Sequence, residues 1–441
     1  MGHMGTSQGD NTVKRSGADP AVRIDRGRSA RRIEEVLEAV SGPRYTRSTT
    51  TICRYAFTPE YANTVRYFAT ALEGLGYETR EDPVGNFVAR NRPDGEPTYG
   101  VGSHCDSNRN GGKYDGTLGV VAALELCRLE SELDLGLPLQ VVVPVEEEAS
   151  GFGHAMLGSA IMAQAVDEDD LRALRAIDDG RSFWSHAEAA GFEPDRWREC
   201  RGPLEQMLGW LELHIEQGRV LQDAEVPIGI VDGIVGIVHA DVAIHGSADH
   251  AGATPMEIRR DAGIEAARLA LDITELAKAS RSGVVATVGE LDLDPGLINV
   301  VPGSVRFSLD VRGPDSVEID EIVDKALSHA QASAAALGMR VEHSERSRVA
   351  PTPMDDRVVR ALEGAAHRSG IPHLIMRSGA CHDTMHIARH VPAAMVFVPC
   401  RDGISHSPLE YADPADAALG AEIILNALLS LASSEQVNDR K

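Results

Sequence analysis

The spacing of apolar and polar residues predicts that helices and short strands alternate in the first part of the chain. Apolar residues recur at helical spacing in three stretches, residues 22–40, 59–74 and 117–129. Two short strand-like runs, residues 86–90 and 98–103, separate the second stretch from the third. The run 139–145, LQVVVPV, is apolar without a break, as expected of a strand buried on both faces of a mostly parallel sheet. This alternation indicates an α/β fold class.

A different order of elements follows in the middle of the chain. It reads strand, helix, strand, strand, helix, strand, over residues 240–245, 256–280, 284–291, 305–311, 317–337 and 339–343. This is the split β-α-β order of ferredoxin-like α+β modules. After it, a helix (358–369) and a buried strand (393–399) return to the first pattern. We therefore predict one α/β domain, residues 22–229 and 350–441, interrupted by an inserted domain, residues 230–349.

Composition and charge exclude several classes of partner. The chain of 441 residues has 43 basic and 67 acidic side chains, which gives a formal net charge of −24. Because phosphate neutralisation needs a surplus of Lys and Arg, the charge excludes nucleic acid and anionic lipid. Hydrophobic residues make up 43% and charged residues 25%, as in ordinary soluble globular proteins. We see no apolar stretch close to the roughly 18 to 20 residues that span a bilayer, so no membrane partner is expected.

The chain start and the cysteines bear on the compartment. Residues 1–21 are polar and without an apolar core, so we expect a disordered tail and no secretory signal. Its first residues, MGHMG, look like a vector remnant. Six cysteines are scattered without a CxxC pair, at Cys53, Cys105, Cys127, Cys200, Cys381 and Cys400. This spacing argues against a disulfide framework and against a cysteine-based zinc site, and a reducing cytoplasm is the expected location.

The first segment that carries chemistry is GSHCDS (102–107), followed by GGKYDG (111–116). His104 comes just after a predicted strand, and Asp115 comes after a glycine-rich loop at the start of a predicted helix. Asp106 could orient the His104 imidazole, as a metal-ligating histidine usually requires. The alternative is a polar turn in which Asp115 caps the helix.

Three further segments place polar residues at predicted strand ends. Glu146, Glu147 and Glu148 follow the buried strand and repel one another unless a cation or a proton compensates them. The alternative for these glutamates is a solvated run of charge. The other two segments are WLELHIEQG (210–218), where Glu212, His214 and Glu216 share one face of a strand, and DGISHSP (402–408), which contains His406.

These segments are expected to converge, because ligands of open α/β sheets bind beyond the carboxyl ends of the strands. Two or three histidines with several carboxylates and no thiol form a nitrogen and oxygen site that suits Zn, Mn, Co or Ni. The sequence does not choose between these metals. Because there are more carboxylates than one ion needs, we predict two metal ions with a bridging carboxylate and a bridging water.

Several segments together resemble one enzyme family. The segments are GSHCDS, YDG, EEE, LELHIEQG, HAGATPM, INVVPGSVRFSLDVR, SGACHD and DGISHSP. They look like the hydantoinase/carbamoylase branch of the M20 metallopeptidase clan, over residues 54–411. That branch includes N-carbamoyl-L-amino-acid hydrolases, one type of β-ureidopropionase, allantoate amidohydrolases and ureidoglycolate amidohydrolases. The resemblance implies a mostly parallel-sheet metallohydrolase domain that is interrupted by a ferredoxin-like lid and dimerisation domain.

The resemblance also implies a role for each matching residue of the metal site. His104 and His214 would bind one metal ion, His406 and Glu148 the other, and Asp115 would bridge the two. The ions expected on this basis are two divalent metals, with zinc favoured and Mn, Co or Ni as alternatives.

Further matching residues would act on the substrate. Glu147 would be the general base that takes a proton from the bridging water and later gives it to the leaving nitrogen, and Asp106 belongs to the same catalytic group. His250 would polarise the substrate in the active site of the partner subunit. In that case the inserted domain contributes to catalysis across a homodimer. The alternative for His250 is an ordinary turn histidine.

The substrate carboxylate would lie between Asn299 and Arg312, since a guanidinium recognises a carboxylate by two parallel hydrogen bonds. Gln217 and His382 would line the same pocket. In the alternative interpretation, Asn299 and Arg312 are surface residues of a hairpin, and His382 is a structural histidine paired with Asp383.

Three positions depart from the family's usual pattern. Gly151 stands where the family has arginine, Cys105 where it usually has leucine, and Cys381 where it commonly has glycine. All three lie near proposed site residues, so they bear on leaving-group specificity more than on metal chemistry.

The leading hypothesis is a binuclear metal-dependent amidohydrolase that cleaves a C–N bond of an N-carbamoyl-L-amino acid or a related ureido acid. The alternatives are an M20 dipeptidase or N-acyl-amino-acid deacylase, and a non-catalytic relative that only binds a metal or ligand. We also expect a homodimer formed through the inserted domain, whose element order leaves one strand edge free. Lid movement of that domain is expected about hinges near Gly229 and Val349.

Overall fold

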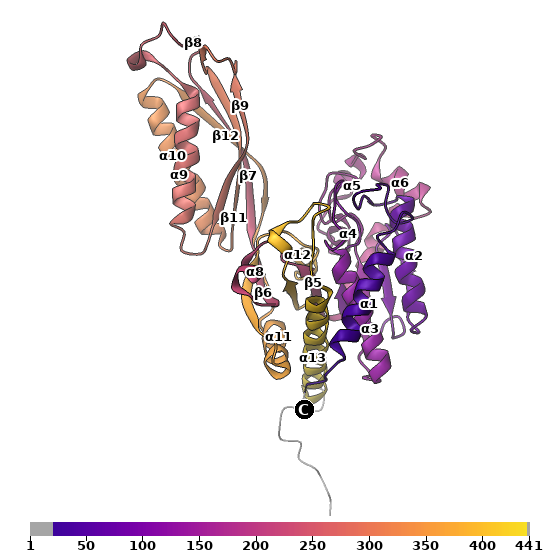
Figure 1. Ribbon diagram of the computed structural model, residues 1–441. Helices are drawn as coiled ribbons and strands as arrows, with labels where there is room; N and C mark the ends of the chain where they lie inside the picture. Colours follow the sequence, from indigo (N-terminus) through magenta and orange to yellow (C-terminus); the bar gives the residue numbers. More distant parts are fainter. Residues whose placement is uncertain (1–20, 439–441) are drawn as a thin grey trace, which may run out of the picture.

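The computed structural model describes residues 21–438. The predicted N-terminal tail, apart from Ala21, lies outside the described residues, and so does its MGHMG opening. The described chain forms two lobes, each with its own sheet (Figure 1).

The larger lobe is built on a nine-stranded sheet whose centre is parallel. Eight strands follow one another in the order β1 (Glu78–Glu81), β2 (Phe87–Arg90), β4 (Leu139–Val143), β3 (Thr98–Gly102), β5 (Met207–Ile215), β15 (Ala393–Val398), β6 (Ile228–Ile234) and β13 (Thr352–Pro353). The ninth, β14 (His373–Ser378), pairs in parallel with β6. The central strands β4, β3, β5 and β15 run parallel to one another, and antiparallel strands flank them. The predicted α/β fold with a mostly parallel central sheet is confirmed.

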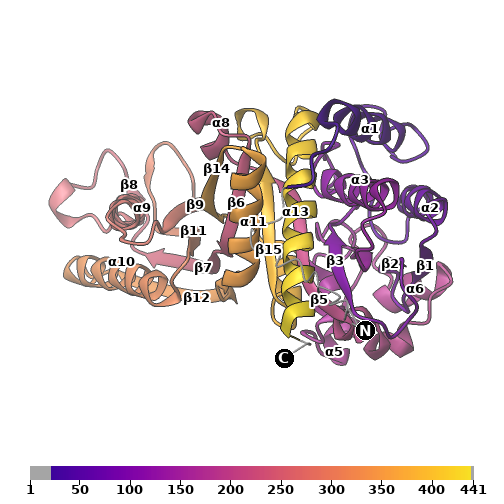
Figure 2. The same ribbon diagram turned by 90° about the horizontal axis from the view of Figure 1, so that it is seen from below.

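Helices cover both faces of this sheet. Five helices pack on one another to form one layer: α1 (Arg26–Ala39), α2 (Pro59–Glu73), α3 (Thr117–Leu133), α11 (Asp356–Ser369) and α13 (Pro414–Asn438). Shorter helices occupy the other side, where Figure 2 shows α5 and α6 across the sheet from α1. These are α4 (Leu157–Met162), α5 (Glu168–Ala173), α6 (Phe183–Ala189), η1 (Pro194–Arg201), α7 (Gly202–Glu205) and α12 (Thr384–Ile387). Two short helices, α8 (Val220–Ala224) and η3 (Arg401–Gly403), lie in loops that follow β5 and β15.

Helix α13 corrects one sequence prediction. Its residues 414–434 are long and apolar enough, by length and composition, to cross a membrane, although we expected no such stretch. Most of this segment is buried inside the lobe, where it packs on α1, α3 and α11 and on strands β5 and β15. A helix that is apolar on nearly every side is expected where the protein itself surrounds it.

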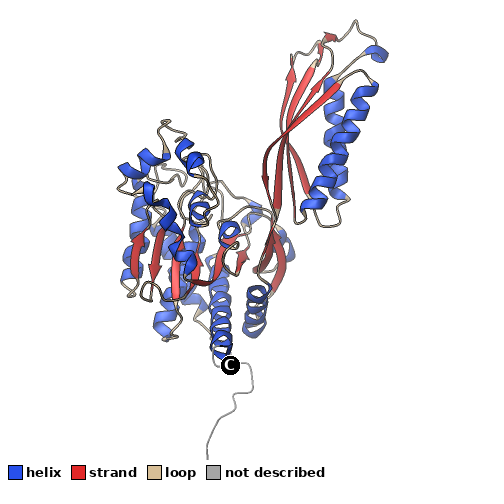
Figure 3. Cartoon of the chain, turned by 180° about the vertical axis from the view of Figure 1, so that it is seen from behind, coloured by secondary structure: helices blue, strands red, loops and turns tan. Residues whose placement is uncertain are grey.

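The smaller lobe, called the insert below, has a four-stranded antiparallel sheet. Its strand order is β12 (Arg340–Val349), β7 (Gly236–His245), β11 (Ser304–Gly313) and β9 (Val285–Asp294). Two helices, α9 (Ala262–Lys278) and α10 (Ser316–Ala336), cover one face of this sheet and enclose a separate apolar core (Figure 3). Along the chain the order is β7-α9-β9-β11-α10-β12, the same order that the sequence pattern predicts. Two short strands, β8 (Asp249–His250) and β10 (Val300–Val301), pair at the far tip, near the short helix η2 (Met256–Ile258).

The chain passes between the lobes at two neighbouring points. Strand β6 ends at Ile234 in the larger sheet, so the passage comes a few residues after the boundary expected at 230, and Gly229 lies inside β6. The chain returns at Pro351, just before β13. A Cβ atom on Gly236 would lie only 2.6 Å from the Pro351 ring, so glycine is what lets the two passing segments touch.

Candidate metal centre

The carboxyl ends of the parallel strands bring the predicted site segments together. His104 follows β3, and Glu147 and Glu148 follow β4. His214 is the last residue but one of β5, and His406 lies in the loop after β15. Because these four strands are parallel, their carboxyl ends meet at one edge of the sheet.

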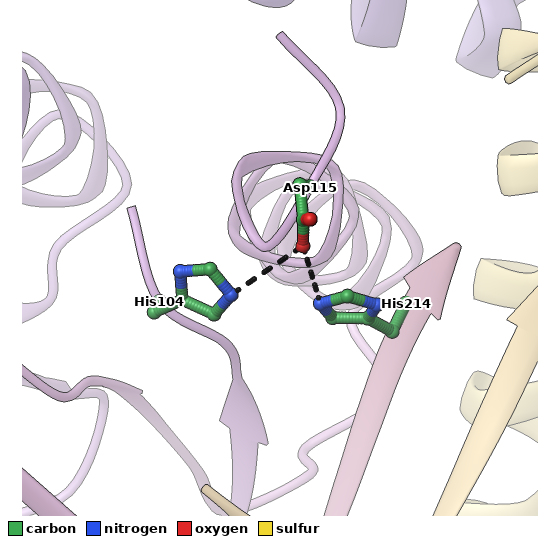
Figure 4. A group of neighbouring side chains, drawn as sticks. All are labelled: His104, Asp115 and His214. Carbon is green, nitrogen blue, oxygen red and sulfur yellow. Dashed lines mark ion pairs between the residues drawn. The ribbon is translucent and has the colours of Figure 1, made fainter. Parts of the chain in front are cut away.

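Two groups of potential metal ligands share one aspartate. In the first group, the Nε2 atoms of His104 and His214 lie 3.7 and 3.2 Å from Asp115 Oδ1 (Figure 4). In the second group, His406 Nε2 lies 3.3 Å from Asp115 Oδ2 and 3.3 Å from Glu148 Oε2. The ligand atoms within each group lie within 4.8 Å of one another. Asp115 therefore presents one oxygen to each group, as a carboxylate between two cations would.

The hydrogen bonds of the histidines suit metal binding. His214 Nδ1 lies 2.9 Å from the carbonyl of Ile215, and the backbone N–H of Gly116 donates to His214 Nε2 at 3.2 Å. A proton on Nδ1 would leave the Nε2 lone pair, on the side of Asp115, for a metal ion. His104 Nδ1 lies 3.2 Å from the carbonyl oxygen and 3.5 Å from Oδ1 of Asp106, which leaves its Nε2 facing Asp115 as well. Such contacts fix the ring orientation and tautomer of a metal-binding histidine.

The charges of the cluster also fit a cation. Burial raises the pKa of the Asp115 carboxyl, but hydrogen bonds from His214 and His406 outweigh burial and hold this pKa well below its ordinary value. Burial, followed by the negative charge of Asp115, raises the pKa of Glu148 to about 7. Carboxylates crowded at one buried place are stabilised by positive charge. The donor set of nitrogen and oxygen atoms without sulfur matches hard or borderline divalent metals.

Glu147 lies beside the first group but belongs to neither. Its side chain is nearly buried, and Oε2 lies 3.7 Å from His104 Nε2. Burial raises the pKa of this carboxyl well above its ordinary value, against the opposing effect of His104. Asp106 supports the same loop, because its Oδ2 accepts the backbone N–H of Glu148 at 3.0 Å.

Two residues predicted to line the substrate pocket lie next to the ligand groups. Gln217 Nε2 donates to Asp115 Oδ2 at 2.9 Å. His382 is buried, and its ring stacks edge to face on His214 with a centroid distance of 4.5 Å. Its Nε2 contacts Ser378 Oγ at 3.0 Å. The alternative interpretation of His382, as a structural histidine, had paired it with Asp383, but its partner is Ser378. Burial holds the pKa of His382 well below its ordinary value.

A third group of potential ligands, Glu212, His214 and His382, is less suited to a metal. Both oxygens of Glu212 already accept hydroxyl hydrogen bonds, from Ser103 at 2.7 Å and from Thr384 at 2.6 Å. Glu212 is a fully buried support for the strand that carries His214.

Three other predicted substrate residues lie in the insert, and one chain does not bring them together. His250 and Asn299 lie at the tip, which Figure 1 shows far from β5 and α12. Arg312 lies at the opposite end of β11, where its Nη1 donates to the carbonyl of Gly379 at 3.0 Å. From Ser304 to Arg312 the strand extends roughly 26 Å at about 3.3 Å per residue. Asn299 and Arg312 of one subunit therefore cannot hold the same carboxylate.

Sequence reasoning missed two residues that support the Asp115 loop. Glu410 is buried, and its Oε1 accepts the backbone N–H groups of both Tyr114 and Asp115 at 2.8 Å. Ser405 Oγ donates to Asp115 Oδ2 at 2.9 Å and contacts Glu410 Oε2 at 3.3 Å. Burial, together with the nearby charge of Asp115, raises the pKa of Glu410 to about 7. No pattern in the sequence marks either residue; in the structure a Cβ atom on Gly112 would lie 2.5 Å from the Glu410 side chain, so the glycine leaves room for this carboxylate.

The structure shows what surrounds Gly151, the first of the three positions that depart from the family pattern. Its backbone N–H donates to Glu146 Oε1, and a Cβ atom there would lie 2.7 Å from Glu146 Oε2. The space next to residue 151 is thus filled by a buried glutamate. Cys105 is buried behind the site, whereas Cys381 is half-buried, and burial raises the pKa of its thiol to about 11.

Comparisons with known proteins agree with these features. Residues 94–430 match the model of the peptidase family M20/M25/M40. The N-carbamoyl-L-amino-acid amidohydrolase of Paenarthrobacter aurescens is 36% identical over 406 residues, which cover 91% of this chain and 98% of that protein. The allantoate amidohydrolase of Escherichia coli is 33% identical, with 86% and 92% covered. A solved hydantoinase/carbamoylase family amidase from Burkholderia ambifaria has a TM-score of 0.82 and 32% identity, with 93% and 98% covered.

Proposed function

Because the chain belongs to the peptidase family M20/M25/M40, and within it to the hydantoinase/carbamoylase branch, we propose that it is an amidohydrolase that uses two metal ions to cleave a ureido acid. That it is a hydrolase of amide or ureido bonds follows from its relatives, which are named amidohydrolases. The substrate we propose is an N-carbamoyl-L-amino acid or a related acid of the allantoate and ureidoglycolate class. The observation that carries the proposal is the pair of ligand groups that share Asp115, with Glu147 beside them.

The reaction that these residues favour is attack of water on a ureido carbonyl. His104, His214, Asp115, Glu148 and His406 would hold two divalent ions, whose positive charge would polarise the carbonyl and activate water. Glu147 takes the proton of the attacking water at a carboxylate oxygen. It then gives this proton to the leaving nitrogen, so that the C–N bond breaks and ammonia can leave. Gln217 and His382 border the space around the reacting group.

The insert provides the groups that recognise the rest of the substrate. Arg312 lies next to the turn that carries His382 and binds the substrate carboxylate. His250 and Asn299 come from the tip of a second copy of the chain, because the tip of the same subunit, marked by β8, lies far from β5, the strand that carries His214 (Figure 1). His250 donates to the developing oxyanion, which is worth about 10²- to 10³-fold in rate for one good donor.

A substrate and metal experiment tests this function. We expect the apoprotein to bind two equivalents of Mn²⁺ or Zn²⁺ in a calorimetric titration. The loaded enzyme is expected to release ammonia from at least one member of a panel of N-carbamoyl-L-amino acids, allantoate and ureidoglycolate. Release of acetate or of free amino acids from N-acetyl amino acids or dipeptides, without ammonia, would favour a deacylase or dipeptidase. Metal binding with no turnover of any compound would favour a non-catalytic relative.

A homodimer through the insert is the second part of the proposal. Strand β9 is an edge of its sheet, and exposed apolar side chains lie along β9 and the neighbouring helix α9, at Ile264, Leu271, Leu291 and Leu293. A second copy would cover this edge and these side chains at once. Cytoplasmic location and lid movement of the insert stay predictions.

We expect the double substitution Leu271→Glu and Leu291→Glu to give a monomer in sedimentation velocity. Activity is expected to fall by roughly 100-fold, because His250 no longer reaches a second active site. Val317→Glu is the matched control, since Val317 is equally exposed on α10, away from the β9 edge. A double variant that sediments as a dimer, or a monomer that keeps full activity, would contradict this arrangement.

A further inference from the structure

Arg312 belongs to a row of polar side chains that crosses the exposed face of the insert sheet. Its Nε and Nη2 donate to Oδ1 and Oδ2 of Asp310, both at 2.8 Å. Asp310 Oδ2 lies 3.2 Å from His239 Nε2, and His239 Nδ1 lies 3.0 Å from Ser347 Oγ. The row therefore runs over three strands, from β12 through β7 to β11.

The strand register explains why these side chains meet. Asp310 pairs directly with His239, and His239 pairs directly with Ser347. A bulge between Glu345 and Ser347 shifts the register of β12 so that Ser347 lies opposite His239. Arg312 lies two residues after Asp310 and so projects from the same face of β11.

The bonds leave Arg312 with the donors that a carboxylate needs. A guanidinium has five N–H donors in a fixed plane. Among the described residues, Asp310 takes two and the Gly379 carbonyl takes one. Two donors remain, which is the number that a bidentate carboxylate accepts. Burial raises the pKa of the Asp310 carboxyl, but Arg312 and His239 outweigh burial and lower it, so Asp310 is an anion at neutral pH.

Within the function proposed above, we infer that Asp310, supported by His239, is a positioning residue that holds the Arg312 guanidinium in one plane as the receptor for the substrate carboxylate. Arginine side chains are long and adopt many rotamers, and fixing one of them before binding lowers the entropy that binding costs. The contact of Arg312 with Gly379 places this receptor beside the turn of residues 378–383, which carries His382. Recognition is thereby directed to planar carboxylates and away from neutral analogues of the same shape.

The inference predicts a loss of affinity that is specific to the carboxylate. The probes are N-carbamoyl-L-alanine and its neutral amide, titrated by calorimetry into the metal-loaded Glu147→Gln protein so that no turnover occurs. In this background Asp310→Asn is expected to weaken binding of the acid by about 10-fold and to leave binding of the amide unchanged. His239→Leu is expected to shift acid binding in the same direction, and His239→Gln, which keeps an N–H donor, by less than about 2-fold.

A matched control is available on the same sheet face. Asp241 makes a two-point pair with Arg346, as Asp310 does with Arg312, but it lies away from the Gly379 contact. Asp241→Asn is therefore expected to leave the affinity of both probes unchanged. Equal losses for acid and amide in Asp310→Asn, or no loss in either Asp310→Asn or His239→Leu, would overturn the inference.

The experiment separates this inference from the proposed function. If Arg312→Ala weakens acid binding while Asp310→Asn and His239→Leu do not, the positioning role alone fails. If Arg312→Ala leaves acid binding unchanged, both the positioning role and the assignment of Arg312 as carboxylate anchor fail. Ammonia release by the unsubstituted enzyme is independent of either result. Should Asp310→Asn not fold, as judged by circular dichroism, His239→Leu gives the same comparison.

Discussion

Replacing Glu147 with glutamine is expected to reduce turnover by at least about 10²- to 10⁴-fold, the range that positioned acid–base groups contribute. Glutamine has nearly the same shape but cannot accept the proton of the attacking water. Glu147 is in neither group of potential ligands, although its Oε2 lies 3.7 Å from His104 Nε2. Metal binding is therefore expected to survive the substitution, which separates a lost base from a lost ligand.

The measurement is kcat for ammonia release together with the metal content of the same preparation. Glu148→Gln serves as the comparison, because Glu148 lies in the second ligand group and its substitution is expected to lower metal content. A Glu147→Gln enzyme that retains full rate with both metals bound would contradict the mechanism. Loss of metal from Glu147→Gln would instead assign Glu147 to the ligands.

A large effect on stability is expected from Arg54. This side chain is fully buried, and no described carboxylate lies within ion-pair distance of it. Its Nε donates to the Cys105 carbonyl at 2.6 Å, and its Nη atoms donate to the Val40 carbonyl at 2.7 Å and to Thr117 Oγ1 at 2.8 Å. It thus ties the loop that contains His104 to the start of α3. Arg54→Met is expected to lower the free energy of unfolding by about 3 kcal/mol, since several buried acceptors lose their donors at once.

Denaturation of the metal-free protein by urea checks this value. Arg281→Met is the control, because Arg281 is exposed and its loss is expected to change stability by less than about 0.5 kcal/mol. Arg54→Lys is expected to recover only part of the difference, since an ammonium cannot reach all the acceptors of a planar guanidinium. Equal midpoints for Arg54→Met and Arg281→Met would show that the buried arginine has no such role.

Features of the fold and of the site that depend on short stretches of chain could be predicted from local patterns in the sequence. The parallel core of the large sheet follows from apolar runs such as 139–145, and the order of elements in the insert follows from its change of periodicity. His104, Asp115, Glu148, His214 and His406 could be predicted to converge because each lies near the carboxyl end of a parallel strand. Those five residues lie in the two ligand groups.

Contacts between distant segments could not be predicted in this way. Glu410 supports a loop almost 300 residues earlier in the chain, and nothing in its own neighbourhood marks it as buried. The row Ser347, His239 and Asp310 depends on a register shift in β12, which leaves no clear pattern in the sequence. The membrane-length apolar segment in α13 was not predicted either. Polar residues at its start and alanines within it interrupt the run of large apolar residues, although its mean hydropathy is high.

The contact between Gly236 and Pro351 has a consequence for how the chain folds. The two parts of the larger lobe are separated in sequence by about 115 residues, which is a long loop to close. If the insert folds first around its own core, its two ends already lie together, and the effective loop shrinks to a few residues. This order of events lowers the free energy of loop closure by roughly 3 kcal/mol when β13 and β15 join the earlier strands. An autonomous insert would then act as an intramolecular template for the active lobe, and its destabilisation would slow refolding of a lobe that it barely touches.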